Sequence, residues 1–345
     1  MCLRLGYHRE LPPGGLPVTG LKPRVSVIVL TWNGKRYLPG CLGALAVQTF
    51  RDFEVILVDN GSEDGSGQYV REAFPWVRLV ELPENLGFAE GNNRGLATAQ
   101  GKLIVTLNND TLAEPGFLAE LVGAAERYPR AGMIAALLVN FYDPARIDAA
   151  GIAPGFDGLG YCLGHGEPVG APWDTSREVF GPSAGAALYR REMIDEIGFF
   201  DAAFFAYAED FDLAWRGRRA GWPCMTAPQA VVRHVHSATS GTESPFTIYH
   251  IHRNKWYVLL KDWPTRLLLR HLPRILMADL AALSVALLKG RGGAALRARW
   301  GVLAALPWLL VKRREDDGKR APLPVEQLFA RGLSLAALKR KLGMS

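Results

Sequence analysis

The stretch VSVIVLTWNG (25–34) is a β-branched, apolar run that ends in a polar turn, and the same pattern returns in VILVDNGSEDGS (55–66) and VTLNNDT (105–111). Each apolar run is typical of a strand buried on both faces. The predicted strands are 24–30, 53–58, 77–82 and 103–107, and stretches with helical spacing separate and follow them at 37–48, 66–74, 89–99 and 117–127. This alternation predicts an α/β fold with a mostly parallel, Rossmann-like sheet and flanking helices.

Three polar turns follow these strands, and ligands of such sheets bind beyond the carboxyl ends of the strands. Asp59 can accept the imide N–H of a pyrimidine base, or it can cap an Asn-Gly turn. Asp110, at the end of Asn108-Asn109-Asp110, can hold Mg²⁺ or Mn²⁺ and through it a diphosphate, or it can belong to a simple turn. The two aspartates are therefore candidate nucleotide and metal ligands.

A second group of candidates lies after residue 141. Residues 181–189 (GPSAGAALY) predict a strand with close backbone approach. Residues 208–220 predict a helix with acids at its start and arginines at its end. A carboxylate at the start, in Glu209-Asp210-Phe-Asp212, can act as a general base or merely cap the helix, and the sequence alone does not choose among the three.

Two further motifs leave both a functional and a structural interpretation open. His234, in His234-Val-His236, follows an apolar run and can be a metal ligand or a structural histidine. Arg253-Asn254-Lys255 can bind a phosphate or a charged acceptor, or it can cap a helix.

The order of the motifs resembles family 2 glycosyltransferases with the GT-A fold, and in its second half their rhamnosyltransferase-like branch. The resemblance covers about residues 24–260, some two-thirds of the chain, and rests on VSVIVLTWNG, Gln48-Thr49-Phe50, VILVDNGSEDGS, ENLGFAEGNNRG (84–95), VTLNNDT, GPSAGAALYRREM (181–193), FFAYAEDFDLAWRGRRAGW (204–222), the His234 segment and Arg253-Asn254. Each piece alone is weak, but their joint order is highly specific.

The resemblance implies a role for each matching residue. It places Asp110 and His234 at the metal, Asp210 as the catalytic base, Glu209 beside the base or acceptor, and Arg253 and Asn254 at an acceptor or phosphate. It places seven residues around the nucleotide: Thr31, Asn33, Asp59, Asn85, Gly87, Asn92 and Asn109. Asn108 stands where the family's metal motif has its first aspartate, so the metal would have one protein carboxylate.

The implied reaction is an inverting, metal-dependent transfer of a sugar from dTDP-rhamnose or a UDP-hexose to a hydroxyl of a glycan or a lipid-linked acceptor. Such transfers build cell-surface polysaccharides or glycolipids. The alternatives are a catalytically inactive sugar-nucleotide-binding module and a nucleotidyltransferase. The turn after the first strand, Thr-Trp-Asn-Gly-Lys-Arg, has too few glycines for the usual phosphate loop of the latter.

Charge divides the chain unevenly. Residues 264–345 hold 16 Lys and Arg against 5 Asp and Glu, whereas residues 1–263 hold 24 against 29. A basic tail on an acidic body favours attachment to anionic lipid over nucleic-acid binding. An interfacial amphipathic helix fits the tail better than a transmembrane span, and a helix packed on the domain or on a second copy in a homodimer stays open.

The predicted organisation has four parts. These are a lead-in (1–23), a nucleotide-sugar-binding half (24–140), an acceptor and catalytic half (141–263) and the basic helical tail (264–345). The four scattered cysteines form no C-x-x-C pair, and the first residues lack an apolar signal-peptide stretch. We therefore expect a cytoplasmic enzyme that is peripheral to the inner face of the cell membrane.

Overall fold

The computed structural model describes residues 22–235, 244–317 and 325–329. Nearly all of the predicted lead-in, the segment with His236 and the end of the tail therefore lie outside the described residues.

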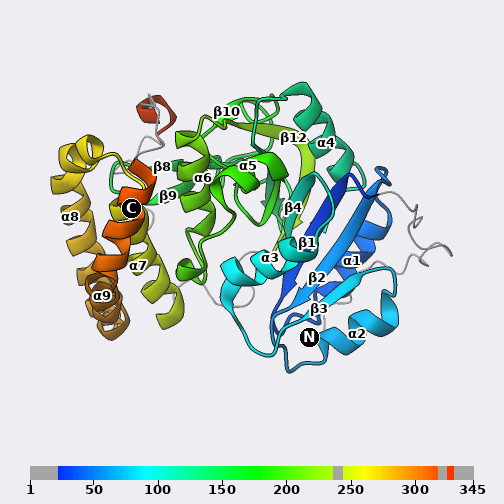
Figure 1. Cartoon of the computed structure of the whole chain (residues 1–345), viewed down its shortest axis with the longest axis horizontal. Coiled ribbons are helices and arrows are strands. Elements are labelled where there is room, and N and C mark those ends of the chain that lie inside the picture. The colour runs from blue at the N-terminus through cyan, green and yellow to red at the C-terminus, as the bar shows by residue number, and fades with distance from the viewer. Residues whose placement is uncertain (1–21, 236–243, 318–324, 330–345) are drawn as a thin grey trace.

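A ten-stranded mixed sheet forms the centre of the molecule (Figure 1). Its strands are β1 (Val25–Thr31), β2 (Phe53–Asp59), β3 (Arg78–Glu81), β4 (Leu103–Asn108), β5 (Thr111–Ala113), β6 (Met133–Asn140), β7 (Ile147–Ala149), β10 (Glu178–Val179), β11 (Ala186–Arg190) and β12 (Cys224–His234). The order is β10-β12-β6-β11-β4-β1-β2-β3, with β5 beside β12 and β7 beside β6. β8 (Ile152–Pro154) and β9 (Gly160–Cys162) form a separate pair.

The strand pairings confirm the mostly parallel α/β sheet. β1 pairs in parallel with β2 and β4, β2 with β3, and β6 with β12, while β11 runs antiparallel between β4 and β6. The strand predicted at 181–189 begins later, at Ala186, because the residues before it form a turn. The close approach expected there is found at Gly181, where a Cβ would lie 2.4 Å from the Cβ of Ala214.

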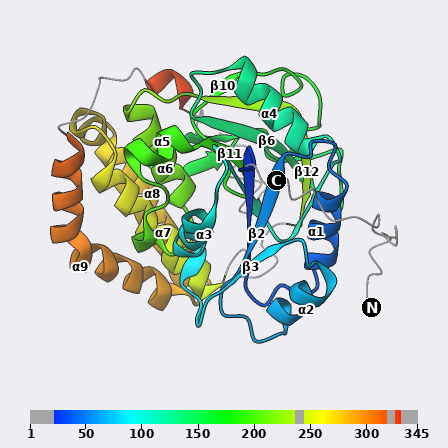
Figure 2. The same cartoon turned by 45° about the vertical axis from the view of Figure 1, so that its right-hand side comes forward.

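Helices cover both faces of the sheet (Figure 2). The shorter ones are α1 (Leu38–Ala46), α2 (Ser66–Ala73), α3 (Gly87–Thr98), α4 (Phe117–Arg127), α5 (Arg191–Ile197) and α6 (Glu209–Arg219), with the 3-10 turns η1 (Ala202–Phe204) and η2 (Val325–Leu328). Along β1, Val27 and Val29 pack in the core with α1 and α4, whereas Ile28 packs in the core with α3 and α6. The alternation of a strand buried on both faces thus separates two apolar cores.

The end of the described chain is a set of long helices at one side of the molecule: α7 (Pro245–Lys261), α8 (Thr265–Leu288) and α9 (Gly292–Asp317) (Figures 1 and 2). α9 packs along α7, with the rings of Tyr257 and Trp308 5.5 Å apart and Arg313 donating to the carbonyl of Leu260 at 2.8 Å. The helical tail is confirmed, but within the described residues it is two long helices, and α9 packs closely against α7.

Candidate active site

The three polar turns meet at one edge of the sheet. β1, β2 and β4 are parallel neighbours, and their register pairs Thr31 with Asp59 and Leu30 with Asn108. The carboxyl ends of these strands therefore lie side by side, as the sequence predicts.

The turns after β1 and β4 are tied together by amide side chains. Asn109 donates through Nδ2 to Thr31 Oγ1 at 2.8 Å. Gly34 allows this contact, because a Cβ at position 34 would lie 2.0 Å from that Nδ2 atom. Asn33 has a left-handed φ of 51° and accepts from the backbone N–H of Glu63 at 2.8 Å, which joins the turns after β1 and β2.

A second network positions the segment before α3, and its central residue was missed from the sequence. Asn60 donates through Nδ2 to Asn85 Oδ1 at 2.9 Å and to the Gly87 carbonyl at 3.1 Å. Its neighbour Asp59, which is 6% exposed, accepts from the Ser62 N–H at 3.0 Å. Asn60 belongs to the polar turn after β2, but nothing in the local sequence indicates that its side chain contacts residues 85–87.

Asn92 has a different setting from the other predicted nucleotide residues. It is 1% exposed, and its Nδ2 donates to the Phe88 carbonyl one turn earlier in α3, at 2.9 Å. The predicted contact between Asn92 and the nucleotide remains a prediction.

The two predicted metal ligands lie next to each other. β12 pairs with β5 so that His234 faces Thr111, and this register brings His234 Nε2 to 3.4 Å from Asp110 Oδ1. The side-chain amide of Asn108 is also 3.4 Å from Nε2. Asp110 and His234 are both 8% exposed.

A second acidic residue, missed from the sequence, orients the histidine. Asp148, on the short strand β7, lies 2.7 Å from His234 Nδ1 through its Oδ2. The carboxylate on Nδ1 leaves Nε2 on the side of Asp110, and such a carboxylate partner is common for metal-binding histidines. Burial alone would lower the pKa of His234, but hydrogen bonds to Asp110 and Asp148 outweigh it and raise the pKa to about 9.

These residues fit a divalent cation that a ligand completes. Asp110 Oδ1 and His234 Nε2 lie 3.4 Å apart, and Mg²⁺ or Mn²⁺ binds through few protein ligands when phosphates supply the rest. Among the described residues, no cluster of three or more His, Cys, Asp or Glu is arranged to hold an ion alone.

The base candidate lies at the first turn of α6. Asp210 accepts through Oδ2 from the Ala184 N–H at 3.1 Å and through Oδ1 from the Phe211 N–H at 2.8 Å. Burial raises the pKa of Asp210 against the effect of these N–H groups. Burial and the Asp210 charge raise the pKa of Glu209 well above its usual value, and Glu209 is 6% exposed.

One turn of the backbone contacts both Asp210, the candidate base, and the end of β4, which leads to the candidate metal ligand Asp110. Ala184 binds Asp210, and the next carbonyl, that of Gly185, accepts from the Asn108 N–H at 2.9 Å. Thr106 Oγ1 fixes the turn further by donating to the Ala184 carbonyl at 2.8 Å. The predicted metal and base residues therefore share one part of the molecule.

Comparison with known proteins identifies the family. The sequence profile of Glycosyl transferase family 2 matches residues 26–198. The chain belongs to glycosyltransferase family 2. It is 31% identical over 262 residues to the N-acetylglucosaminyl-diphospho-decaprenol L-rhamnosyltransferase of Mycobacterium tuberculosis, an alignment that covers 68% of this chain and 83% of the relative. The glycosyltransferase is also 29% identical over 234 residues to the O-antigen biosynthesis protein RfbC of Myxococcus xanthus, covering 65% of the chain and 18% of that protein.

Solved structures confirm the GT-A fold of this glycosyltransferase. The mannosyltransferase PcManGT of Pyrobaculum calidifontis, in complex with GDP-Man and Mn²⁺, superposes with a TM-score of 0.53 at 21% identity and covers 87% of this chain and 86% of its own. GalNAc-T7, with UDP, GalNAc and Mn²⁺, gives a TM-score of 0.54 at 17% identity, covering 67% and 47%. At these identities the likeness establishes the fold.

Arg253 and Asn254 of this glycosyltransferase contact its own backbone. Asn254 is fully buried, and Arg253 donates through Nη2 to the carbonyls of Ala203 and Phe204 at 3.0 and 2.9 Å. Contact with an acceptor or a phosphate stays a prediction for these two residues.

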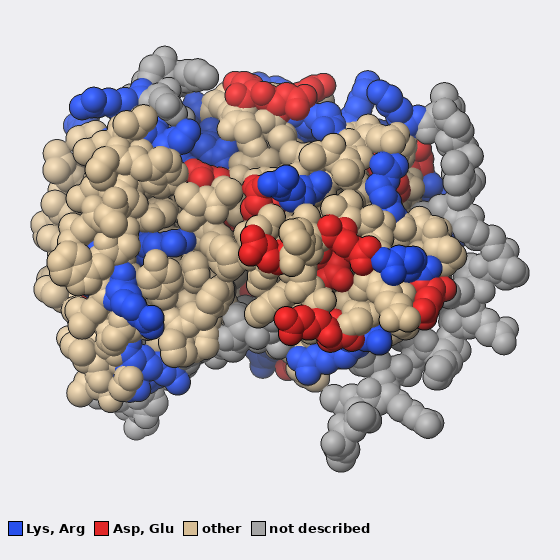
Figure 3. Space-filling view, turned by 60° about the horizontal axis from the view of Figure 1, so that its bottom comes forward, with Lys and Arg blue, Asp and Glu red and all other residues tan. Residues whose placement is uncertain are grey.

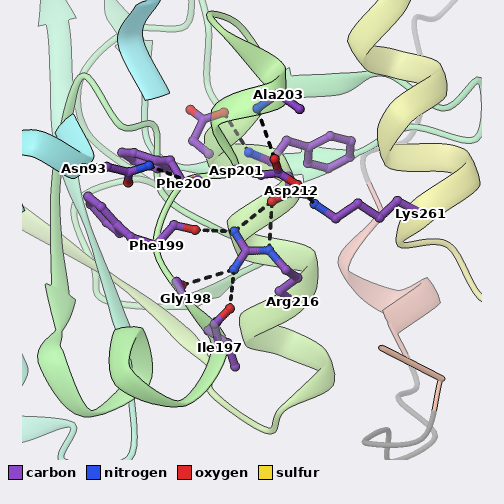
Figure 4. A network of polar contacts seen from close by, with 12 residues as sticks. Asn93, Ile197, Gly198, Phe199, Phe200, Asp201, Ala203, Asp212, Arg216 and Lys261 are labelled. Carbon is purple, nitrogen blue, oxygen red and sulfur yellow. Dashed lines mark hydrogen bonds and ion pairs between the residues drawn. The ribbon is translucent and has the colours of Figure 1, made fainter. Parts of the chain in front are cut away.

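A buried ionic network around Asp212 and Arg216 supports α6 (Figure 4). Asp212 accepts from Arg216 Nε at 2.8 Å and from Lys261 Nζ, and Lys261 also binds Asp201 at 2.6 Å. Arg216 continues to the carbonyls of Ile197 and Phe199 at 2.7 and 2.5 Å. The network connects the helix that carries Asp210 with the last turn of α7.

Proposed function

We propose that this glycosyltransferase moves a sugar from a nucleotide diphosphate to an acceptor hydroxyl by a single displacement with inversion. The observation that carries the proposal is the turn at Ala184 and Gly185, which contacts Asp210 on one side and the end of β4 at Asn108 on the other. A displacement between two substrates requires the base and the metal-bound donor to be held close together. A turn that contacts the proposed base and the strand leading to the proposed metal ligand meets this requirement.

In this proposal Asp210 takes the proton of the attacking hydroxyl. The N–H groups of Ala184 and Phe211 hold its carboxylate, and the raised pKa makes it a stronger base than an exposed aspartate. Burial and the Asp210 charge raise the pKa of Glu209, which favours its protonated form, and a protonated carboxyl group can donate a hydrogen bond to the acceptor. No described group is hydrogen-bonded to the Oε2 atom of Glu209.

Asp110 and His234 would hold Mg²⁺ or Mn²⁺, with Asp148 fixing the imidazole. The ion would neutralise charge on the departing nucleotide diphosphate. The protein holds both ligands in place before the ion binds. Asp110 is buried to 8% exposure, and a 2.7 Å contact with Asp148 fixes the His234 ring. Both features limit the rearrangement that binding requires.

The donor we propose is dTDP-rhamnose, with UDP-hexoses as the competing class. The relative from Mycobacterium tuberculosis, named as a rhamnosyltransferase acting on a diphospho-decaprenol sugar, supports a lipid-linked acceptor and a role in cell-surface polysaccharide or glycolipid assembly. The nucleotide would lie at the turn of Asp59 and Asn60, next to Asn85.

Replacing Asp110 by alanine tests this proposal. We expect Mn²⁺-dependent binding of dTDP-rhamnose or a UDP-hexose to weaken by at least about tenfold. Loss of a residue that only supports a metal ligand already lowers metal affinity by about tenfold or more. Calorimetric titration with and without Mn²⁺ measures it. Asp143→Ala, a change of an exposed aspartate after β6, is the matched control. Equal Mn²⁺ dependence in wild type and Asp110→Ala would refute the metal role.

We also propose that α8 and α9 attach the enzyme to an anionic membrane surface on its cytoplasmic side. By length and composition both helices could cross a membrane. Their large apolar side chains are exposed, including Met277 (66%), Leu280 (62%), Leu288 (88%), Trp300 (71%) and Leu303 (55%). Figure 3 shows the lobe at the left as largely uncharged, with scattered basic side chains.

The polar contacts of this lobe favour lying on the membrane over crossing it. Asp279, the acidic residue of α8, binds Lys255 Nζ of α7 at 3.0 Å and Arg299 Nη2 of α9 at 2.7 Å, so its charge is paired between the three helices. An acidic residue that is paired inward and apolar residues that point outward are typical of an interfacial helix.

The double variant Leu280→Glu with Trp300→Glu tests the membrane proposal. We expect its partition onto vesicles of anionic lipid to fall by at least about tenfold for each substitution, since one buried apolar side chain contributes roughly 1.5–3 kcal/mol. Vesicle co-sedimentation measures the effect. Val169→Glu, at a side chain 46% exposed on the catalytic domain, is the control. Undiminished vesicle binding of the double variant would exclude this surface as the anchor.

A further inference from the structure

The segment that leads into the base helix has an unusual backbone. Phe205, Tyr207 and Ala208 have φ values of 65°, 69° and 66°, in the left-handed region that residues with a Cβ rarely adopt. α6 begins at the next residue, Glu209, and Ala208 supplies no side-chain cap. Such conformations are energetically unfavourable and persist only where surrounding groups enforce them.

Asn254 of α7 supplies that enforcement. Its Nδ2 group donates to the carbonyls of Phe204, Ala206 and Tyr207 at 2.9, 2.8 and 2.7 Å, so two hydrogens are shared among three carbonyls of one loop. Asn254 is 0% exposed, and its Oδ1 accepts from Arg253 Nε at 2.9 Å. Both ends of the amide are therefore fixed.

The opposite side of the loop rests on the nucleotide half. The Phe205 carbonyl accepts from the Ala89 N–H of α3 at 3.1 Å. Gly87 permits this approach, because a Cβ there would lie 2.5 Å from the same oxygen. Towards α7, the ring of Phe205 stacks on His250 with centroids 5.3 Å apart. The loop is thus held between α3, which borders the donor turn, and Asn254.

We propose that Asn254 is a positioning residue that sets the direction of Asp210 by holding the 204–208 loop in its left-handed conformation. This rests on the proposed role of Asp210 as base. If the loop relaxed, α6 would begin differently, and the carboxylate would lose its alignment with the Ala184 N–H. A misplacement of about 1 Å at a reacting group costs about a hundredfold in rate.

Asn254→Asp separates positioning from binding. It keeps the size of the side chain and the oxygen facing Arg253 but removes the donor hydrogens that the loop uses. We expect kcat to fall by about a hundredfold, while the KM values for donor and acceptor and the Kd for the nucleotide with Mn²⁺ stay within about twofold of wild type. Asn254→Leu, which introduces no charge, should show the same split.

Lys255→Met is the matched control for damage to α7. Lys255 is the next residue, is 6% exposed, and directs its ammonium to Asp279 of α8 instead of the loop. We expect it to lower the melting temperature at least as much as the Asn254 variants do, with kcat close to wild type. A loss of kcat in Lys255→Met that matches its loss of stability would overturn the proposal.

Two further outcomes would also contradict it. Unchanged kcat in both Asn254 variants would show that the loop does not need the amide. A rise in either KM with kcat intact would mean that Asn254 contacts a substrate directly. Asp210→Asn, assayed in parallel, keeps the two questions apart: if that variant retains full activity the base assignment fails, whatever the Asn254 variants do.

Discussion

Replacing Asp210 by asparagine is expected to lower sugar transfer by about a thousandfold, within the range that general base catalysis contributes. Asparagine has the size of aspartate and an oxygen that can still accept from the Ala184 N–H, but it cannot take a proton from the acceptor hydroxyl. Binding of the donor with Mn²⁺ should remain, because Asp110 and His234 are untouched. Initial rates and donor titrations on the same preparation measure both effects.

The same change at Asp195, an exposed residue of α5, should leave the rate unaltered and controls for the substitution itself. The wild-type rate should also depend on pH in a defined direction. Since burial raises the pKa of Asp210, kcat should decline on acidification at a pH above the ordinary aspartate value of about 4. Rapid transfer by the Asp210→Asn enzyme would remove Asp210 from the chemistry.

The second large effect is expected in stability, from Lys261→Met. Lys261 is 2% exposed and binds Asp212 and Asp201, so its removal leaves buried carboxylates with less compensation. Breaking such a pair costs about 3–5 kcal/mol in the free energy of unfolding. Denaturant unfolding of wild type and variant measures the difference, and Lys102→Met, at an exposed site, is the control.

This network also has a pH signature. Burial would raise the pKa of Asp212, but Arg216 and Lys261 outweigh it and hold the pKa below its usual value. A carboxyl group with a lowered folded-state pKa stabilises the protein at neutral pH, and this contribution disappears as the pH falls through the folded value. Lys261→Met should therefore flatten the acid limb of the stability curve. If Lys261→Met changed the free energy of unfolding by less than about 0.5 kcal/mol, as a typical surface substitution does, the ionic network would not have the expected stabilising role.

The parts of the site that the sequence predicts are those with a local pattern. Asp59 and Asp110 directly follow apolar strands, and parallel strands bring such positions to one edge. Asp210 stands at the acidic start of a helix with a basic end. The positions of these residues follow from the periodicity of the chain, whereas their roles came from the resemblance to the family.

The parts that could not be predicted depend on long-range contacts. Asp148 lies on a three-residue strand, and only folding brings it to His234, 86 residues further along the chain. Asn254 could be singled out from the sequence as part of a polar motif. Whether its amide faces a ligand or a backbone loop depends on how α7 packs. The tail was expected as a basic amphipathic helix, and the pairing of Asp279 with Lys255 makes part of it a neighbour of the catalytic domain.

Two consecutive residues of α7 contact different elements. Asn254 is hydrogen-bonded to the loop before Asp210, and Lys255 pairs with Asp279 of α8. A shortened enzyme ending at residue 263 would leave the ammonium of Lys255 without its counter-ion and uncover the flank of α7 that Trp308 shields. Trimming is therefore a poor route to a water-soluble preparation. Polar replacements on the outer side of α8 and α9 would instead preserve the packing of these helices on α7.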